Sequence, residues 1–292
     1  MQYLSLRARA LAPALAGLAA LALTACNGNS GGVLGPISNF GPGGNNAQVR
    51  FVNGSPDSGR VEIFIDNQQQ FCTGGSTGSA CTISYGQATT YAVKLNPGSH
   101  AIMLRDANGN QITIPNASVS VNGGFRYSLE LAGEVHPSYG STPTLQLLTT
   151  AEQPFNTPGG GAAVNFHYAA PFVQSTNAGS IQFGYFNNNT AASNPLGQPV
   201  ALGSETTPQG LPGTELNAPI TFYAASPTSG MTGTPGQFST QCSSNALPCD
   251  TGNLSLYLVD GPAASTSPVT TLPAGVNAST KAFFIGAFDQ NG

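Results

Sequence analysis

Charged side chains are scarce in this chain of 292 residues, because Asp, Glu, Lys and Arg together make up only 7 % of it. That fraction is very low for a cytoplasmic enzyme, whereas exported bacterial β-proteins often have such a composition. The formal net charge is −4, and two of the eight basic residues, Arg7 and Arg9, lie in an N-terminal leader. Since no basic patch is left to neutralise phosphates, the sequence argues against nucleic acid as a partner.

Tryptophan is absent and histidine occurs only three times. The lack of tryptophan weakens the case for a sugar-binding platform, which depends on aromatic stacking. His100, His136 and His167 do not have a metal-ligand spacing, so we expect strand-face or loop roles for them and no metal or cofactor. Two Gly-x-Ser-x-Gly matches, at Ser30 and Ser76, lie in Gly/Ser-rich stretches rather than between a strand and a helix. We therefore expect that the chain is not an enzyme.

The leader contains no apolar run long enough to span a bilayer. Arg7 and Arg9 form a positive region, and the apolar region Leu11–Leu23 that follows is only as long as that of a signal peptide. A secretory leader is thus predicted, and with it export from the cytoplasm.

The leader ends in Leu23-Thr24-Ala25-Cys26, which resembles the lipobox of bacterial lipoproteins. The resemblance implies cleavage after Ala25, so that residues 1–25 are a lipoprotein signal peptide, and acylation of the Cys26 thiol. Three acyl chains on Cys26 would hold the protein on a membrane far more firmly than a single acyl chain could. Asn27 in the next position points to the outer membrane of the bacterial envelope, on its periplasmic or surface face. The alternative is an ordinary secretory leader with a cysteine nearby.

Four cysteines remain in the mature chain, and they form two local pairs. Cys72 and Cys81 lie in FCTGGSTGSAC, and Cys242 and Cys249 lie in QCSSNALPC. An even number of cysteines in an exported chain favours disulfides, so we predict Cys72–Cys81 and Cys242–Cys249 bridges. A zinc site is the alternative, but neither pair has the shorter gap that zinc ligands favour.

Glycine and proline, by contrast, are abundant, with 37 and 22 residues, which suits many short strands and turns rather than long helices. In the stretch Ala47–Asn67, Val49 and Phe51 alternate with Arg50. After a Gly/Pro-rich turn, Val61, Ile63 and Ile65 alternate with Glu62, Phe64 and Asp66. A period of two predicts half-buried strands, here two strands of a hairpin. The plan recurs from Ala163 in AVNFHYAAPFVQSTNAGSIQFGYF.

These patterns predict an all-β protein with two tandem, antiparallel, immunoglobulin-like β-sandwich domains. The predicted boundaries are a Gly/Asn-rich tether over 26–46, a first domain over 47–150, a linker over 151–161 and a loop-rich second domain over 162–292. The linker contains proline and a glycine triplet, so few contacts are expected to cross it. The alternation in the first strand predicts that Phe51 is buried, whereas Arg50, on the opposite face, should be exposed and tolerant of substitution.

Three segments of the first half resemble a family of bacterial proteins, the domain of unknown function 4397. They are VRFVNGSPDSGRVEIFIDN from Val49, YAVKLNPGSH from Tyr91 and YSLELAG from Tyr127. The resemblance covers the first predicted domain, and the second in part through the turn at Tyr168–Pro171. Its members are often lipoproteins with tandem copies, so it implies a β fold and a cell-envelope location.

Two functions are compatible with the sequence. The first is a non-enzymatic, lipid-anchored envelope protein whose tandem sandwiches bind a protein or glycan partner or act as a spacer. The alternative is a carbohydrate-binding or adhesive surface module that uses residues such as Tyr185 and the run Asn187–Asn189.

Overall fold

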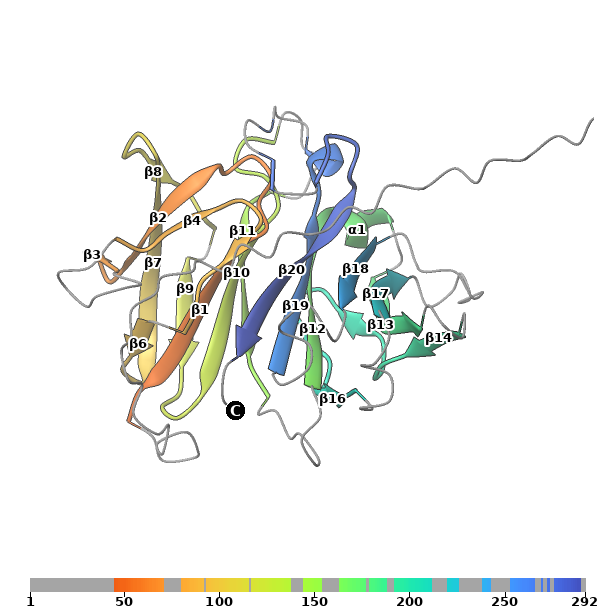
Figure 1. Ribbon diagram of the computed structural model, residues 1–292. Helices are drawn as coiled ribbons and strands as arrows, with labels where there is room; N and C mark the ends of the chain where they lie inside the picture. The colour runs from red at the N-terminus through yellow and green to blue at the C-terminus, as the bar shows by residue number, and fades with distance from the viewer. Residues whose placement is uncertain are drawn as a thin grey trace, which may run out of the picture.

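The computed structural model describes fourteen stretches of the chain. They are residues 45–70, 80–91, 93–115, 117–137, 144–153, 163–176, 179–187, 192–211, 220–225, 238–242, 253–265, 269, 272–273 and 276–289. Almost all regular structure in them is strand, which confirms the predicted all-β class (Figure 1). The exceptions are a short α-helix, α1 (Pro171–Thr176), and a single 3-10 turn, η3 (Pro262–Ala264).

The strands before residue 152 form two sheets. One has the order β11 (Gln146–Ala151), β10 (Arg126–Ala132), β1 (Ala47–Asn53), β5 (Gln87–Ala88), with β6 (Val93–Leu95) also paired to β1. The other has the order β3 (Gln68–Gln69), β2 (Arg60–Ile65), β7 (Gly98–Asp106), β8 (Gln111–Ile112), with β4 (Thr82–Ser84) paired to β2 and β9 (Ser118–Val121) paired to β7.

The strands after residue 162 also form two sheets, and in the described residues no sheet mixes strands from the two halves. One has the order β16 (Gln209–Gly210), β12 (Ala163–Ala169), β19 (Asn253–Asp260), β20 (Ala282–Asp289). The other has the order β14 (Ala192–Pro195), β13 (Ser180–Asn187), β17 (Ile220–Ala225), β18 (Phe238–Cys242), with β15 (Val200–Ala201) paired to β13. We call β1–β11 the first unit and β12–β20 the second unit.

The two units share a pairing that the expectation of antiparallel sheets did not include. The first strand of each unit pairs in parallel with a strand distant in sequence: Phe51 lies opposite Leu129 in β1–β10, and Phe166 lies opposite Leu256 in β12–β19. The other pairings between the described strands are antiparallel. β10 and β19 therefore occupy equivalent places in the two units.

The opening pair of strands is not a hairpin, as the sequence pattern had suggested. β1 and β2 lie in different sheets of the first unit, so the turn between them crosses from one sheet to the other. A period of two fixes which face of a strand is apolar but not which strand pairs with it. The predicted faces are correct, since Val49, Phe51, Val61 and Ile63 all lie in one buried core.

Each unit has its own apolar core between its two sheets. In the first unit the core contains Phe51, Ile63, Leu104 and Leu129. In the second unit it is built around Phe166, whose ring stacks on that of Phe183 with centroids 4.9 Å apart. These cores account for one face of each inner sheet, the sheets that contain β1 and β12.

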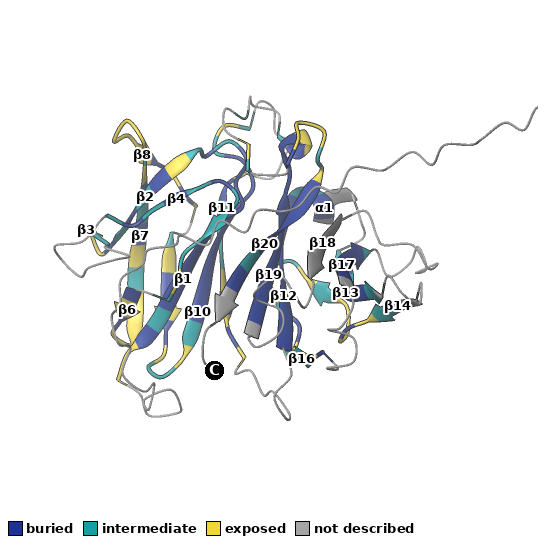
Figure 2. Cartoon of the chain, viewed as in Figure 1, coloured by how far each residue is buried: buried dark blue, intermediate teal, exposed yellow. Residues whose placement is uncertain are grey.

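The opposite faces of the inner sheets are buried as well, because they pack against each other. A third apolar cluster joins Val52 and Tyr85 of the first unit to residues of the second unit: Ala169, Tyr257, Val259, Val276, Phe283, Ile285 and Ala287. Figure 1 shows the four sheets following one another from β2 and β7 at the left to β13 and β14 at the right, and in Figure 2 the strands in the middle are the most buried. The expectation that few contacts cross between the two halves is therefore wrong. We call this contact region the joint.

Candidate functional site

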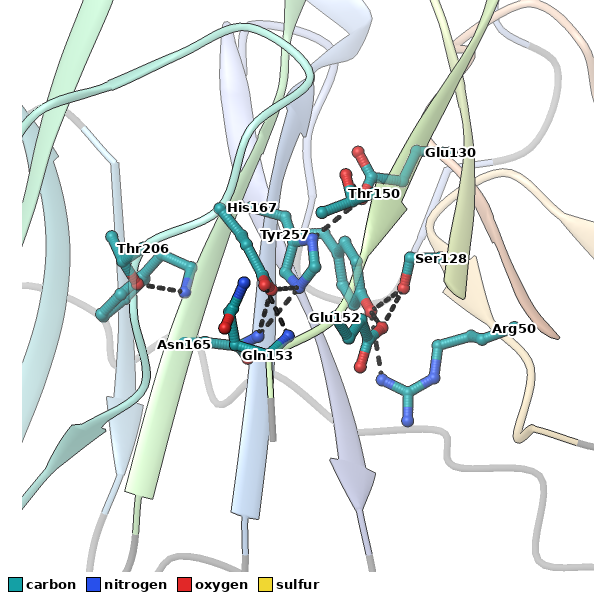
Figure 3. A network of polar contacts seen from close by, with 12 residues as sticks. Arg50, Ser128, Glu130, Thr150, Glu152, Gln153, Asn165, His167, Thr206 and Tyr257 are labelled. Carbon is teal, nitrogen blue, oxygen red and sulfur yellow. Dashed lines mark hydrogen bonds and ion pairs between the residues drawn. The ribbon is translucent and has the colours of Figure 1, made fainter. Parts of the chain in front are cut away.

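Polar side chains from both units are buried together within the joint (Figure 3). β1 contributes Arg50 because Val49 and Phe51 point into the core of the first unit, which turns Arg50 toward the second unit. Arg50 is only 1 % exposed. Its Nη1 donates a hydrogen bond to the Tyr257 hydroxyl at 3.1 Å, and its guanidinium carbon lies 4.0 Å from the centroid of the Tyr91 ring. The predicted exposure of Arg50 is thus wrong.

Tyr257 of β19 connects that arginine to a carboxylate. Its hydroxyl donates to Glu152 Oε1 at 3.2 Å and lies 2.6 Å from Ser128 Oγ, which also donates to Glu152. Glu152 follows β11, at the start of the segment predicted to be a linker, and is 7 % exposed. Hydrogen bonds to charged groups are about twice as strong as those between neutral groups. The start of the predicted linker is therefore fastened to both units.

His167 of β12 is completely buried between two more carboxylates. Its Nδ1 lies 2.9 Å from Glu130 Oε1 of β10, and its Nε2 lies 3.4 Å from Glu205 Oε2, in the loop before β16. The imidazole also stacks on the Tyr257 ring, with centroids 4.2 Å apart. Burial by itself lowers the pKa of His167, but the hydrogen bond to Glu130 and the carboxylates around it raise the pKa above its ordinary value. The neighbouring carboxylates thus favour protonation of the ring, against the effect of burial.

Glu205 ties the far side of this cluster to the segment after β11. Its Oε2 accepts a hydrogen bond from Asn165 Nδ2 at 2.7 Å, and its Oε1 accepts one from the backbone N–H of Gln153 at 2.7 Å. Burial raises the pKa of Glu205, and the charge of His167 and these hydrogen bonds only partly offset that effect.

Two oxygens among these polar side chains of the joint, Glu130 Oε2 and Asn165 Oδ1, are buried and receive no hydrogen bond within the described part of the chain. A buried acceptor without a donor costs about 1–3 kcal/mol, so these two oxygens lower the stability of the folded protein. The described residues contain no group of three or more His, Cys, Asp or Glu side chains that could hold a metal ion.

At the end of the joint where β1 and β19 finish, buried aspartates bind backbone N–H groups. Asp57 accepts hydrogen bonds from the N–H groups of Val135 and His136 at 2.7 and 2.8 Å. Asp260 accepts from those of Phe172 and Val173 at 3.0 and 3.3 Å. In each unit the contact ties together the segments that follow the two parallel strands.

Asp260 also has an unusual protonation equilibrium. Burial raises its pKa to about 7, against the effect of the two backbone hydrogen bonds. Its own carbonyl oxygen accepts a hydrogen bond from the Tyr85 hydroxyl of the first unit at 2.8 Å. Asp260 therefore has a carboxyl group that titrates near neutral pH and a backbone carbonyl that contacts the first unit across the joint.

The residues singled out from the sequence lie elsewhere. Cys26, Cys72 and Cys249 are outside the described residues, so lipidation and both disulfide pairings stay predictions. Cys81 is buried in the core of the first unit, and Cys242 ends β18 opposite Ile220.

The other two histidines have the strand and loop positions expected of them. His100 in β7 contacts Asp66 at 2.7 Å, and His136 lies in a loop near Asp57. Tyr185, on which the carbohydrate hypothesis partly rested, is only 5 % exposed and lies in the core of the second unit, so it offers no stacking surface for a sugar. Asn188 and Asn189 are outside the described residues.

A sequence signal for the joint did exist. In LSLYLVD of β19 both faces are apolar, with Leu254, Leu256 and Leu258 on one and Tyr257 and Val259 on the other. Such a strand is typical of a sheet that is covered on both sides. The polar partners were not recognisable, because they come from strands far apart in sequence.

Comparison with known families agrees with the resemblance seen in the sequence. The family model described as Domain of unknown function (DUF4397) matches residues 47–195, about half of the chain. The chain belongs to the DUF4397 family. The DUF4397 match begins with β1 and ends at β14, so it continues past the predicted linker into the second unit. It includes Arg50, Glu130 and His167 but ends before Glu205 and Tyr257.

None of the curated proteins matches this DUF4397 chain. Within its described residues, no helix has the length and apolar character needed to cross a membrane.

Proposed function

We propose that this DUF4397 protein is a non-enzymatic, lipid-anchored component of the bacterial cell envelope whose two β units act together as one stiff binding or spacer element. The observation that carries the proposal is the joint. Two independently moving sandwiches would leave the outer faces of β1 and β19 in water, whereas here both faces are buried against each other. Domain contacts that are both apolar and hydrogen-bonded restrict relative motion.

The anchor is supported by the sequence around Cys26. Three features coincide there: a positively charged segment, a short apolar segment and a cysteine preceded by small residues. The chain between Cys26 and β1 has about 20 residues rich in glycine and asparagine, enough to keep the folded units clear of a membrane surface.

The non-enzymatic character is supported by the placement of the acidic and basic residues. Glu130, Glu152 and His167 lie together in the joint, and all three are buried. A general acid or base has to come within hydrogen-bond distance of a substrate. Titratable side chains whose polar atoms are in contact with other buried groups of the two units are better suited to holding those units together.

The experiment expresses the full chain in a bacterial host with labelled palmitate and separates soluble, inner-membrane and outer-membrane fractions. The wild-type chain should carry label and sediment with outer membrane, whereas Cys26→Ser should carry none. Ser30→Ala, in the same tether, is the matched control and should behave as wild type. Label that persists on the Cys26→Ser chain would exclude the anchor. Concentration-dependent hydrolysis of an ester, glycoside or peptide substrate by the purified chain would exclude the non-enzymatic part.

A further inference from the structure

His167 lies where a single proton changes the charge balance of the whole joint. The imidazole belongs to the second unit, and the carboxylate at its Nδ1, Glu130, belongs to the first. Glu205, at its Nε2, is bound in turn to the Gln153 N–H that follows β11. The ring therefore lies between a carboxyl group of the first unit and one of the second, with the Asn165 Nδ2 atom 3.1 Å from its Nε2.

The groups that face this ring come from every strand around it. Three carboxylates face it from Glu130, Glu152 and Glu205. Tyr257 of β19 stacks on it and is hydrogen-bonded to Arg50 of β1. A second arginine, Arg126 of β10, lies 5.0 Å from the centroid of the Tyr91 ring that Arg50 also covers. Among the described side chains of β20, Phe283, Ile285 and Ala287 belong to the apolar cluster on this face.

With His167 protonated, its positive charge lies among the carboxyl groups of Glu130, Glu152 and Glu205. Without that proton, the negative charge buried around the ring loses this partner. A buried charge without a partner is costly because it has been removed from water. Water that reaches these groups would reduce that cost. For water to enter, the two inner sheets have to separate.

We propose that His167 is a proton-operated latch: when protonated it holds the two β units together, and when it loses the proton at alkaline pH the joint opens while each unit keeps its own core. The latch requires the joint alone and does not depend on the lipid anchor or on the envelope role proposed above.

The direction of the effect follows from the surroundings of the ring. Carboxylates on both sides raise the pKa of His167 in the folded chain, despite burial. A raised pKa means that the proton stabilises the closed joint below the ordinary pKa of histidine, and that this stabilisation is lost as the pH rises through the folded pKa. Each further pH unit weakens the closed state by up to about tenfold for one titrating group.

The test places a single new thiol in the joint. Ala169 is fully buried in the joint, and Ala47 is fully buried in the core of the first unit. Ala169→Cys and Ala47→Cys variants of the detergent-solubilised full chain are labelled with a thiol reagent from about pH 6 to about pH 9, a range that brackets histidine titration. The unsubstituted chain gives the background. The ratio of the two labelling rates cancels the pH dependence of the thiolate.

The ratio of Ala169→Cys to Ala47→Cys labelling should rise with pH by about tenfold or more across the range. In an Asp260→Asn background, which removes the other group of the joint that titrates near neutral pH, adding His167→Gln should make the ratio high and independent of pH, since glutamine cannot carry the charge. Adding Glu130→Gln should shift the rise to lower pH, because the carboxylate that holds the proton is gone. His100→Gln, a histidine paired with Asp66 away from the joint, is the control and should leave the curve unchanged.

A ratio that stays constant with pH in the wild-type background would overturn the proposal, as would a pH-dependent rise that survives when His167→Gln and Asp260→Asn are combined. If His167→Gln does not fold, the wild-type curve and the Glu130→Gln shift decide. A Glu130→Gln curve that coincides with wild type would then count against the latch.

Discussion

Arg50 and Tyr257 are 207 residues apart in the chain, yet the arginine donates a hydrogen bond to the tyrosine hydroxyl at 3.1 Å inside the molecule. The first strand of the first unit thereby contacts the central strand pair of the second unit. Through Tyr257 the contact continues to Glu152, so that a buried cation and a buried carboxylate share one hydroxyl group. The two halves of the chain are coupled by charge as well as by apolar packing.

Replacing Arg50 should therefore destabilise the protein severely. Arg50→Ala leaves Glu152 and Tyr257 buried without their cation, and breaking such a pair costs about 3–5 kcal/mol. The free energy of unfolding from urea titration measures the loss. Arg105→Ala is the matched control, because Arg105 is exposed on β7 and only covers the Phe64 ring at 4.7 Å. Equal losses for the two substitutions would contradict the buried role of Arg50.

The chain should unfold as a single cooperative unit despite its two apolar cores. Separating the units would expose the apolar joint residues Val52, Tyr85, Val259 and Phe283. At about 25 cal/mol per Å² of apolar surface, that exposure is unfavourable enough to couple the two melting transitions. Differential scanning calorimetry of the full chain below neutral pH should give one transition, with equal calorimetric and van't Hoff enthalpies.

The same reasoning applies to a fragment of residues 47–150. It would present the buried face of β1 and β10 to water and end before Glu152. We expect it to keep its own core but to associate through that face. A fragment that stays monomeric as its concentration is raised would show that this face does not need to be covered.

Gly54 allows the first unit to approach the second, and adding a methyl group there should force them apart. A Cβ at this position would lie 2.5 Å from Val259 Cγ1 and 3.1 Å from the Leu131 carbonyl oxygen. Overpacking of this kind costs about 1–3 kcal/mol, so Gly54→Ala should lower the melting temperature by several degrees.

A double-mutant cycle can show that Val259 is the cause. Val259→Ala leaves a small cavity in the joint and should destabilise on its own. In the double variant the new methyl group can occupy part of that space, so the combined loss should be smaller than the sum of the single losses. Strict additivity of the two losses would place the strain of Gly54→Ala elsewhere.

Asp260 should make the protein lose stability between acid and neutral pH. Its pKa is about 7 in the folded chain, against an ordinary value of 3.8. A raised pKa means that the folded state holds the proton more tightly. Its stabilising effect is complete below the ordinary value and is lost progressively as the pH rises through about 7, a change on the order of a few kcal/mol.

Asp260→Asn should remove that part of the pH dependence, because the amide oxygen can still accept from the Phe172 and Val173 N–H groups. Unfolding free energies between about pH 4 and about pH 8 should be flatter for the variant than for wild type. The two curves should approach each other at the acid end. Parallel curves across the whole range would assign the pH dependence to other groups.

The amino-acid pattern was sufficient for the strands and for the faces that fill the two cores. Phe51, Ile63 and Leu129 each belong to a strand in which core residues recur with a period of two. The apolar side of such a strand is buried whichever strand lies next to it. Asn-Gly pairs favour tight turns between strands, and Asn108–Gly109 lies in the turn between β7 and β8, where Gly109 has a φ of 84°. Such local signals depend only on residues close in sequence.

The joint could not be predicted in the same way. Arg50 has the appearance of a solvent-facing residue, because arginine is almost never fully buried unless it is paired. Its partners come from β19 and from the end of β11, and a period-two pattern contains no information about which sheet will cover which. For the same reason the parallel neighbours of β1 and β12 emerged only from the three-dimensional arrangement.

The position of β1 within its sheet has a mechanical consequence. β1 has neighbours on both sides, with β10 in parallel register along six residue pairs and β5 and β6 on the other side. Any pull transmitted along residues 26–46 enters the folded part at Ala47 and runs along the strand. The hydrogen bonds on both sides of β1 are then loaded together in shear instead of being opened one at a time, so the protein would yield to traction only at a high force.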